Sequence, residues 1–404
     1  MKSAISFQSV DILFSTGNDQ RRGLQKALAA LDQGLTRDEI QKQFGVIVGV
    51  AGASLSVAAG EISVLMGLSG SGKSTLLRAA NGLNRVTRGC VLIADGEANI
   101  DIARCDATQL RRVRRQRVAM VFQQFGLLPW RTVRANVGLG LELRGERSET
   151  IARIVEEKLE LVGLTKWADR FVSELSGGMQ QRVGLARAFA TDADILLMDE
   201  PFSALDPLIR AKLQDELLEL QARVKKTILF VSHDLDEALK LGDRISILQE
   251  GRIIQTGTAE DIVLTPADGY VREFVQHMNP LTVLTGGMIM RRRADLQSDG
   301  EMVWLDAARR YRLQVAAGGE ALALQVDGTA HALRVIQSEA DDSHSAPGLA
   351  VVPADMSLRS IIRLRQASGH PVLVADAGCI VGVCGEADII LALAGARHAG
   401  TAPH

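Results

Sequence analysis

The stretch GLSGSGKST at residues 67–75 decides the fold, because it follows an apolar run at 62–66 and leads into a helical pattern. It matches Gly-x4-Gly-Lys-Ser/Thr in the context this motif needs, between a strand and a helix. The glycines let backbone N–H groups converge on phosphate oxygens, Lys73 can reach the β- and γ-phosphates, and the Ser74 hydroxyl can bind Mg²⁺. We therefore predict a nucleotide-binding phosphate loop. The residues expected to hold the phosphates are Gly67, Ser69, Gly70, Ser71, Gly72, Lys73, Ser74 and Thr75.

A second part of the same site is expected at Asp199 and Glu200, which end the apolar run 195–199. A carboxylate that ends a parallel strand lies at the carboxyl edge of the sheet, beside the phosphate loop, where it can hold Mg²⁺. Glu200 would then face the γ-phosphate and polarise an attacking water, which is the work of a general base. Two merely solvated acids are the alternative, and the neighbouring phosphate loop disfavours it.

The pattern between Glu61 and Gly257 alternates short apolar runs with longer amphipathic stretches, which indicates an α/β fold with a parallel sheet covered on both faces. A chain of 404 residues is long enough for two to three domains. The expected organisation is a first domain at 1–278, with an inserted helical element at about 20–44 and a helical subdomain at about 130–190, a linker at 279–300, a smaller α+β domain at 301–396, and a flexible tail at 397–404.

The composition limits the partners that the chain can have. The 46 Lys and Arg residues against 48 Asp and Glu give a formal charge of −2, and aromatic residues make up only 4%, so neither a basic field nor stacking platforms favour nucleic acid. The basic run 111–117 is interpreted as a solvated helix face near lipid headgroups. No window approaches 18 consecutive apolar residues, and the first 14 residues have a strand pattern, so we expect a cytoplasmic chain without a membrane span. The four cysteines are expected to be thiols rather than zinc ligands.

The segment LSGGMQQR at 175–182 opens a second helix with a Ser-Gly-Gly turn, which is a second anion-binding helix start. With this segment and the two motifs above, residues 1–275 resemble the nucleotide-binding subunit of an ABC transporter. The resemblance implies ATP and Mg²⁺ as cofactors and a head-to-tail homodimer with two ATP molecules at its interface. The signature residues implied to cap the partner's ATP are Ser176, Gly177, Gly178 and Gln180.

Further family motifs follow in order along the chain. Gln123 resembles the glutamine that joins Ser74 and Asp199 in the magnesium shell, and Asp206 resembles the D-loop aspartate that crosses the dimer interface. His233 resembles the switch histidine that holds the γ-phosphate and the attacking water, so that Glu200 and His233 form the implied catalytic pair. The family also places an aromatic residue on the adenine. Phe44 is the candidate, and a core position for it is the open alternative.

The segment FGLLPW at 125–130 is too apolar for a free surface loop. In the family this region contacts the membrane permease, and internal packing of Trp130 is the open alternative. The residues expected at that contact are Phe125, Leu127, Leu128 and Trp130.

The order of elements predicted from Ala350 onward is strand, helix, strand, strand, helix, which resembles a cystathionine-β-synthase-type (CBS) regulatory module. Residues 303–340 could be a degenerate first copy of it. Gly385 stands where the family has a hydroxyl, whereas Asp388 is available for a ribose. Nucleotide sensing and a structural or dimerising role both stay open.

The combined motifs resemble the bacterial quaternary-amine uptake group, whose members import choline, glycine betaine or proline betaine, and FGLLPWRTV leans toward its choline branch. The expected function is ATP hydrolysis that energises such import through a membrane permease and, indirectly, a substrate-binding protein. The subunit would lie peripherally on the cytoplasmic face of the inner membrane, in a system for osmoprotection. The alternatives are a soluble non-transport ABC ATPase and a nucleotide-sensing regulatory protein.

Overall fold

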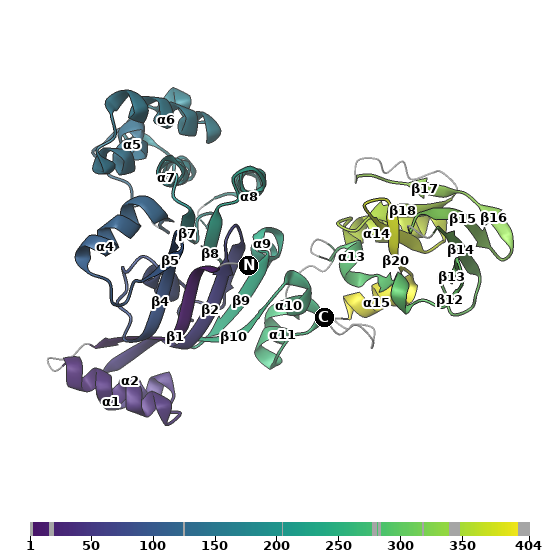
Figure 1. Cartoon of the computed structure of the whole chain (residues 1–404), viewed down its shortest axis with the longest axis horizontal. Coiled ribbons are helices and arrows are strands. Elements are labelled where there is room, and N and C mark those ends of the chain that lie inside the picture. Colours follow the sequence, from purple (N-terminus) through teal and green to yellow (C-terminus); the bar gives the residue numbers. More distant parts are fainter. Residues whose placement is uncertain are drawn as a thin grey trace. The chain divides into compact units, whose positions relative to one another are not determined.

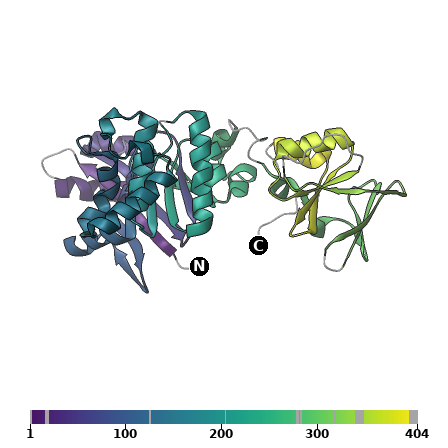
Figure 2. The same cartoon turned by 90° about the horizontal axis from the view of Figure 1, so that it is seen from above.

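The computed structural model of the chain describes residues 3–15, 20–123, 126–203, 205–276, 281, 284–316, 319–338 and 348–394. The chain divides into two compact units, residues 1–259 and 260–404, each with its own sheets and core (Figures 1 and 2).

The first unit is built on a six-stranded sheet in the order β10-β9-β3-β8-β7-β6. Neighbouring strands from β9 to β6 are parallel, and β10 adds an antiparallel edge through a hairpin at Glu250 and Gly251. Every residue of β3, β7 and β8 is buried, as expected for strands whose sequences are apolar on both faces. The strands are β3 (Ile62–Met66), β6 (Val118–Val121), β7 (Ile195–Asp199), β8 (Thr227–Val231), β9 (Arg244–Gln249) and β10 (Arg252–Gly257). The predicted α/β fold with a parallel sheet is confirmed.

Helices follow these strands, and short polar caps fix where several of them begin. Ser176, Asp206 and Asp234 each accept a hydrogen bond from a backbone N–H in the first turn of the helix they precede. The helices are α3 (Lys73–Ala79), α4 (Ala107–Arg112), α5 (Val133–Arg144), α6 (Ser148–Leu161), α7 (Gly177–Ala190), α8 (Pro207–Val224) and α9 (Leu235–Leu241). Helices α5, α6 and α7 share a core that includes Val137, Leu159 and Val183, so the expected helical subdomain is present.

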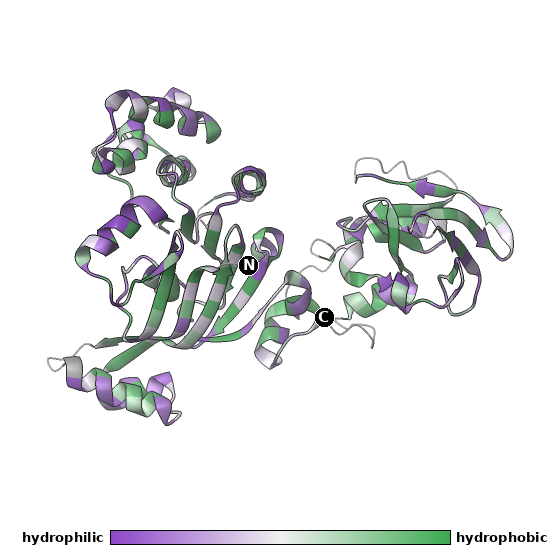
Figure 3. Ribbon diagram, in the orientation of Figure 1, coloured by the Kyte–Doolittle hydropathy of each residue, from purple (hydrophilic) through white to green (hydrophobic). Residues whose placement is uncertain are grey.

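The basic run 111–117 occupies the end of α4 and a π-helical turn, Val113–Arg117, and stands out as hydrophilic on the hydropathy ribbon (Figure 3). Arg111, Arg112, Arg114 and Arg115 are exposed, as a solvated face predicts, and two arginines of the run also form ion pairs inside the unit. Arg112 and Arg117 pair with Asp95, and Arg117 also pairs with Asp194. Through these ion pairs, part of the basic run holds α4 and the turn after it against the sheets.

A second sheet of the first unit, in the order β2-β1-β4-β5, carries the inserted element. Its strands are β1 (Ser3–Ser15), β2 (Val46–Ala58), β4 (Arg88–Asp95) and β5 (Ala98–Asp101), and β1 confirms the strand predicted at the amino terminus. Between β1 and β2 lie α1 (Gln20–Asp32) and α2 (Arg37–Phe44), as the helical pattern predicts. They pack through a cluster that includes Leu31, Ile40, Leu13 and Val48.

The second unit begins earlier than expected, because the division falls after Ala259 rather than at 278. Its first helices are α10 (Ala259–Leu264) and α11 (Gly269–Gln276). The expected linker 279–300 is also corrected, since residues 284–300 include α13 (Gly286–Ile289), β11 (Arg291–Arg292) and β12 (Ser298–Asp299). Residues 284–300 are held because Leu284 and Ile289 are buried and β11 pairs with β20. The expected tail, residues 397–404, lies outside the described residues.

The order predicted for the second CBS-like copy is present in the structure. It consists of β18 (Leu349–Pro353), α14 (Leu358–Ser368), β19 (Val372–Asp376), β20 (Cys379–Cys384) and α15 (Glu386–Leu393). With β11 and β17 (Leu333–Val335), these strands form the sheet β11-β20-β19-β18-β17.

The degenerate first copy predicted at 303–340 is wrong. The described residues 303–316 and 319–338 contain strands and no helix. They contribute to an antiparallel sheet in the order β12-β13-β14-β15-β16, whose buried face shares a core with the neighbouring sheet. Its other strands are β13 (Met302–Trp304), β14 (Tyr311–Val315), β15 (Ala321–Val326) and β16 (Thr329–His331). Alternating burial along β14 is the period-two pattern that favours strands over the helices of a CBS copy.

Candidate nucleotide-binding site

The phosphate loop joins β3 to α3, and its glycines are required by close backbone contacts. Gly67 has φ 142° and Gly72 has φ 102°, in the region that side chains rarely adopt. A Cβ at Gly67 would lie 2.1 Å from the Leu248 carbonyl oxygen, and one at Gly72 would lie 2.4 Å from the Gly49 carbonyl oxygen. The loop is therefore wedged between β3, β2 and the end of β9, which fixes its shape before any ligand binds.

Lys73 crosses the loop and is buried, with 5% of its surface exposed. Its Nζ donates hydrogen bonds to the carbonyl oxygens of Gly67 (2.8 Å) and Leu68 (3.0 Å). Burial lowers the pKa of Lys73, and the carboxylates of Glu200 and Asp199 act in the opposite direction. In the described residues no carboxylate is hydrogen-bonded to Lys73, so this buried cation is available to an anion.

A fit to a triphosphate is also indicated by Ser71. Among the described residues its Oγ has no hydrogen-bond partner, although it is buried in the loop. Buried hydroxyls normally have partners, and a phosphate oxygen would supply one. Together the orphaned hydroxyl, the buried Lys73 and the glycine cradle fit the phosphates of a nucleotide.

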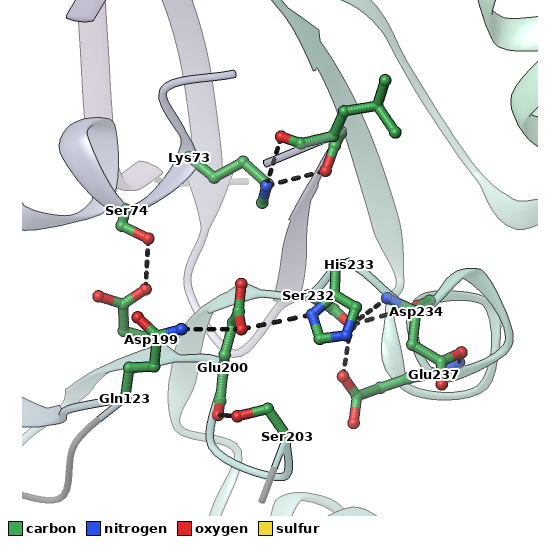
Figure 4. A network of polar contacts seen from close by, with 12 residues as sticks. Lys73, Ser74, Gln123, Asp199, Glu200, Ser203, Ser232, His233, Asp234 and Glu237 are labelled. Atoms are coloured by element: carbon green, nitrogen blue, oxygen red, sulfur yellow. Dashed lines mark hydrogen bonds and ion pairs between the residues drawn. The ribbon is translucent and has the colours of Figure 1, made fainter. Parts of the chain in front are cut away.

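Asp199 ends β7 and is fully buried beside the phosphate loop. The Ser74 hydroxyl donates to its Oδ1 (2.7 Å), so the two predicted magnesium ligands lie together (Figure 4). Their oxygens are the hard donors that Mg²⁺ prefers. Arg78 donates to the other oxygen, Oδ2, through Nε (3.1 Å) and Nη2 (2.8 Å). Sequence reasoning missed Arg78, although its place one turn after Ser74 on α3 puts both side chains on one helix face.

Glu200, Gln123 and His233 converge, as Figure 4 shows. Glu200 Oε2 accepts a hydrogen bond from Gln123 Nε2 (3.1 Å) and lies 3.3 Å from His233 Nδ1. The His233 side chain is 59% exposed, whereas that of Glu200 is 16% exposed, so the imidazole is the outer group. The sequence placed these three residues in one site, and the structure brings them together.

The backbone of Glu200 adopts φ 47°, which is unusual for a residue with a side chain. Its carbonyl accepts hydrogen bonds from the Ser203 hydroxyl (3.0 Å) and the Ser203 N–H (3.3 Å), and its N–H donates to the Val231 carbonyl (3.1 Å). Strained conformations of this kind cost about 1–3 kcal/mol and occur where surrounding contacts hold a functional side chain in place.

A buried polar network supports the turn that carries His233. The Ser232 hydroxyl contacts the Glu237 carboxylate, and the Gln214 amide donates to Glu237 Oε1 (3.0 Å). Burial raises the pKa of Glu237, and the two hydrogen bonds oppose this shift. The sequence analysis assigned no role to these residues. They come from α8, the end of β8 and α9, and they meet only in the folded chain, without a regular spacing in the sequence.

Arg210 links the turn after His233 to the loop before α8. Its Nη1 pairs with Asp234 Oδ2 (3.1 Å), and its Nη2 donates to the Leu205 carbonyl (3.3 Å). The aspartate proposed for the D-loop, Asp206, accepts a hydrogen bond from the Ile209 N–H (3.1 Å) as the cap of α8.

The signature residues lie at the start of α7. The Ser176 Oγ accepts a hydrogen bond from the Met179 N–H (3.4 Å), and Gly177 and Gly178 form the first turn. Gln180 instead donates to the carbonyls of Val172 (3.2 Å) and Leu175 (3.1 Å) within its own loop. In the described ranges, no hydrogen bond or ion pair joins Ser176 or Asp206 to residues 67–75. The structure thus does not assemble these two motifs with the phosphate loop inside one chain.

The contacts of Phe44 favour the core alternative, and its adenine-stacking role stays a prediction. Phe44 ends α2 and packs against the cluster of α1, α2, β1 and β2, which agrees with the core alternative. Phe14, on β1, is 39% exposed, and its Cε2 lies 2.9 Å from the point that a Cβ on Gly49 would occupy. The Thr75 methyl lies 3.0 Å from the same point. Phe14 is therefore an aromatic residue beside the start of α3, and the inserted helices hid it by lengthening its sequence distance from Lys73.

The apolar segment after Gln123 has mixed outcomes. Phe125 lies outside the described residues. Trp130 is 71% exposed, which contradicts internal packing. Leu127 packs partly against the core of the helical subdomain, and the backbone of Leu128 is hydrogen-bonded to the Asn136 side chain. Close by, a cavity of about 360 Å³ is lined by residues from α5, α7 and β6, together with the exposed Leu83 and Leu143.

These features define a nucleotide-binding cassette with a phosphate loop and a carboxylate pair. The ABC transporter family matches residues 50–203. The glycine betaine/carnitine transport ATP-binding protein GbuA of Listeria monocytogenes is 40% identical over 382 residues, which cover 92% of this chain and 94% of GbuA. The chain belongs to this family of ATP-binding subunits of ABC transporters for betaines and related osmoprotectants.

Two further comparisons agree. The glycine betaine/proline betaine transport ATP-binding protein ProV of Escherichia coli is 50% identical over 268 residues, which cover 66% of each chain. A dimeric ATP-binding cassette, MJ0796, in a post-hydrolysis state bound to ADP and Pi, matches with a TM-score of 0.53 and 30% identity over 63% of this chain and 98% of its own. The match with GbuA exceeds the first unit in length, so it extends into the second unit. No helix in the described ranges is long and apolar enough to cross a bilayer.

Proposed function

We propose that the chain is the ATP-hydrolysing subunit that energises import of a quaternary amine, either choline or a betaine. The observation that carries the proposal is the convergence of Lys73, Ser74, Asp199, Glu200 and His233 on one edge of the parallel sheet. Relatives named for betaine transport favour this role over a soluble non-transport ATPase or a nucleotide sensor.

Each polar side chain has a task that its geometry supports. Bound Mg-ATP supplies the phosphoanhydride bond that is cleaved. Lys73 would hold phosphate oxygens, whereas Ser74, Asp199 and Gln123 would hold the metal. Glu200 would accept a proton from the attacking water at Oε2. His233 would hold that carboxylate and the water in line, since its Nδ1 already faces Glu200 Oε2.

A homodimer accounts for the motifs that the single chain leaves apart. Ser176, Gly177 and Asp206 are exposed, Gly178 is half-buried, and none of them has a polar contact with residues 67–75 in the described ranges. In a head-to-tail dimer, the start of α7 from one copy would face the phosphate loop of the other. The solved relative MJ0796 is dimeric, which supports this arrangement.

A membrane permease is the proposed second partner. The exposed Trp130, Leu83 and Leu143 lie around the cavity between the sheet and the helical subdomain or on the adjoining loop, and exposed apolar side chains of this size favour a protein contact. The subunit would sit peripherally on the cytoplasmic face of the membrane. A substrate-binding protein would take part only through the permease.

The second unit is proposed to act as a structural or regulatory module without nucleotide. Asp388, which could have held a ribose, is buried and paired with Arg291 at 3.0 Å. It also accepts a hydrogen bond from the Gly385 N–H (2.6 Å). A carboxylate already engaged in this way does not support nucleotide sensing.

Uptake of labelled choline and labelled glycine betaine, at low and high osmolarity, tests the proposal in cells with the subunit, without it, or with Lys73→Ala. We expect Lys73→Ala to match the deletion, because ATP binding is lost. Loss of choline uptake alone, at both osmolarities, would support the choline branch suggested by residues 125–133. If wild-type cells take up more betaine at high osmolarity and the deletion abolishes this uptake, the subunit belongs to an osmoprotectant importer. Unchanged uptake of both compounds would contradict the proposal.

A further inference from the structure

The inserted helices α1 and α2 reach the phosphate loop. Arg37, the first residue of α2, donates a hydrogen bond through Nη1 to the Gly70 carbonyl (3.1 Å). No ion pair of Arg37 is seen in the described part of the chain. An inserted element would need no such contact if it served only to cover the sheet.

The start of α2 is held rigidly where this contact forms. Thr36 and Glu39 make a reciprocal cap, in which the Thr36 N–H and hydroxyl both donate to Glu39 Oε2 at 2.8 Å. Gly45 closes the other end of α2 in the left-handed conformation. The apolar side of α2 is anchored by the fully buried Ile40. Arg37 is thus presented from a fixed platform.

A cavity of about 300 Å³ opens beside this contact. It is lined by Thr36, Arg37, Asp38 and Gln41 from α2 and its cap, and by Ile47, Val48 and Glu250. The turn containing Glu250 borders the phosphate loop directly, because the Gly251 N–H donates to the Ser71 carbonyl (2.9 Å). Ile47 is 39% exposed and pairs in register with Phe14 across β1 and β2, so their side chains share a face.

The chemistry of the cavity suits a nucleoside better than a phosphate. Asp38 and Glu250 bring two carboxylates, which repel an anion. Gln41 and Arg37 offer donors, the carboxylates offer acceptors, and Ile47 with Phe14 offers an apolar face for a base. The phosphates have their own site in residues 67–75, a short distance along the same wall.

We propose that α2 forms the outer wall of the adenosine pocket, with Arg37 fastening this wall to the phosphate loop and Gln41 facing the nucleoside. This inference rests on the proposed function, because it concerns the same ATP site. It assigns the inserted element, residues 20–44, to nucleotide binding rather than to contact with another subunit.

Equilibrium binding of Mg-ATP and of Mg-tripolyphosphate to the full-length protein tests the wall. Arg37→Ala should weaken ATP binding about tenfold, since the hydrogen bond that holds α2 beside the nucleoside is lost, and should leave tripolyphosphate binding within about twofold. Gln41→Ala should act in the same direction with a smaller effect. The Gln41 side chain is exposed and has no hydrogen bond in the described contacts, so this variant should fold like the wild type. Lys42→Ala removes a neighbouring exposed cation outside the cavity and should change neither affinity.

The outcomes separate this inference from the proposed function. Equal losses for ATP and tripolyphosphate in Arg37→Ala would place Arg37 on the phosphates and overturn the adenosine wall. Unchanged ATP binding in both Arg37→Ala and Gln41→Ala, while the wild type binds ATP, would overturn the wall alone. A wild-type protein that binds neither ligand would overturn the proposed function and this inference with it.

Discussion

The two units use buried polar side chains differently. In the first unit, Lys73, Asp199, Gln214, Ser232 and Glu237 are all buried around one edge of the parallel sheet. In the described part of the second unit, the buried polar side chains are Ser360 and Asp388, and each has a partner within its own fold. These five buried groups of the first unit thus line or support the candidate site, whereas the two of the second unit hold its own structure.

The largest expected effect concerns Glu200 in the first unit. Glu200→Gln keeps the size of the side chain and removes the base, so the turnover number should fall about 10²- to 10⁴-fold while ATP binding is retained. Steady-state phosphate release and equilibrium ATP binding measure the two quantities. Glu219→Gln, an exposed change on α8, is the matched control. Turnover near the wild-type rate would show that Glu200 is not the base.

The corresponding change in the second unit should affect folding only. Arg291→Ala leaves the fully buried Asp388 without its cation, which should destabilise that unit by about 3–5 kcal/mol. Denaturant unfolding followed through Trp304 reports on the second unit, and basal ATP hydrolysis should be unchanged under native conditions. If Arg291→Ala also lowered basal ATP hydrolysis, the second unit would contribute to catalysis, contrary to this prediction. Lys240→Ala, which breaks an exposed pair in the first unit, controls for the loss of a charge.

Two phenylalanines sharpen the comparison within the first unit. Phe14→Ala should weaken ATP binding about tenfold, since stacking on a base contributes about 1–3 kcal/mol. Phe44→Ala should leave ATP binding intact and lower the unfolding midpoint, because Phe44 packs among α1, α2, β1 and β2. Titrations of both variants with ATP, together with thermal unfolding, distinguish the two roles. The reverse pattern would restore Phe44 as the adenine-stacking residue.

The smallest expected effect comes from Glu237. Burial raises its pKa above the unfolded value of 4.5, so the native state binds more protons than the unfolded state above that pH. Stability therefore falls as pH rises through the native pKa, and Glu237→Gln removes this dependence. Between pH 5 and pH 8 the melting temperature of the wild type should fall by about 2–4 °C relative to Glu237→Gln. If the melting temperatures of the wild type and of Glu237→Gln change equally between pH 5 and pH 8, Glu237 does not have a raised pKa in the native state.

Motifs with strict spacing were predictable from the sequence. The phosphate loop, the carboxylate pair and the residues Gln123 and His233 fall within or next to apolar strands, which fix where their side chains emerge. Arg210 and Gln214 were not predictable, because their partners lie on other elements of the fold and an arginine or glutamine on a helix usually faces solvent. Phe14 was hidden because the insertion changed its distance to Lys73.

The second unit shows the opposite case. Its carboxy-terminal half was predicted from alternating strands and capped helices, but the degenerate first copy expected at 303–340 would need helices that the described residues do not form. Buried and half-buried residues alternate along β14, which is the pattern of a strand rather than of a helix in a repeated module. The linker was misplaced for a related reason, since the burial of Leu284 and Ile289 depends on strands that come later in the chain.

The close approach of Gly49, Gly72 and Gly251 limits how the nucleotide site can be altered. A Cβ on Gly72 or on Gly251 would lie 2.4 Å or 3.0 Å from the Gly49 carbonyl oxygen, which is a main-chain atom. A substitution elsewhere changes a side chain and leaves the main-chain oxygen in place. A clash created at Gly72 therefore cannot be relieved by a second substitution at Gly49. A directed search for altered nucleotide preference should keep these three positions fixed. Diversity belongs instead on Phe14, Ile47 and the exposed turn of α2, where side chains can change size without moving the chain.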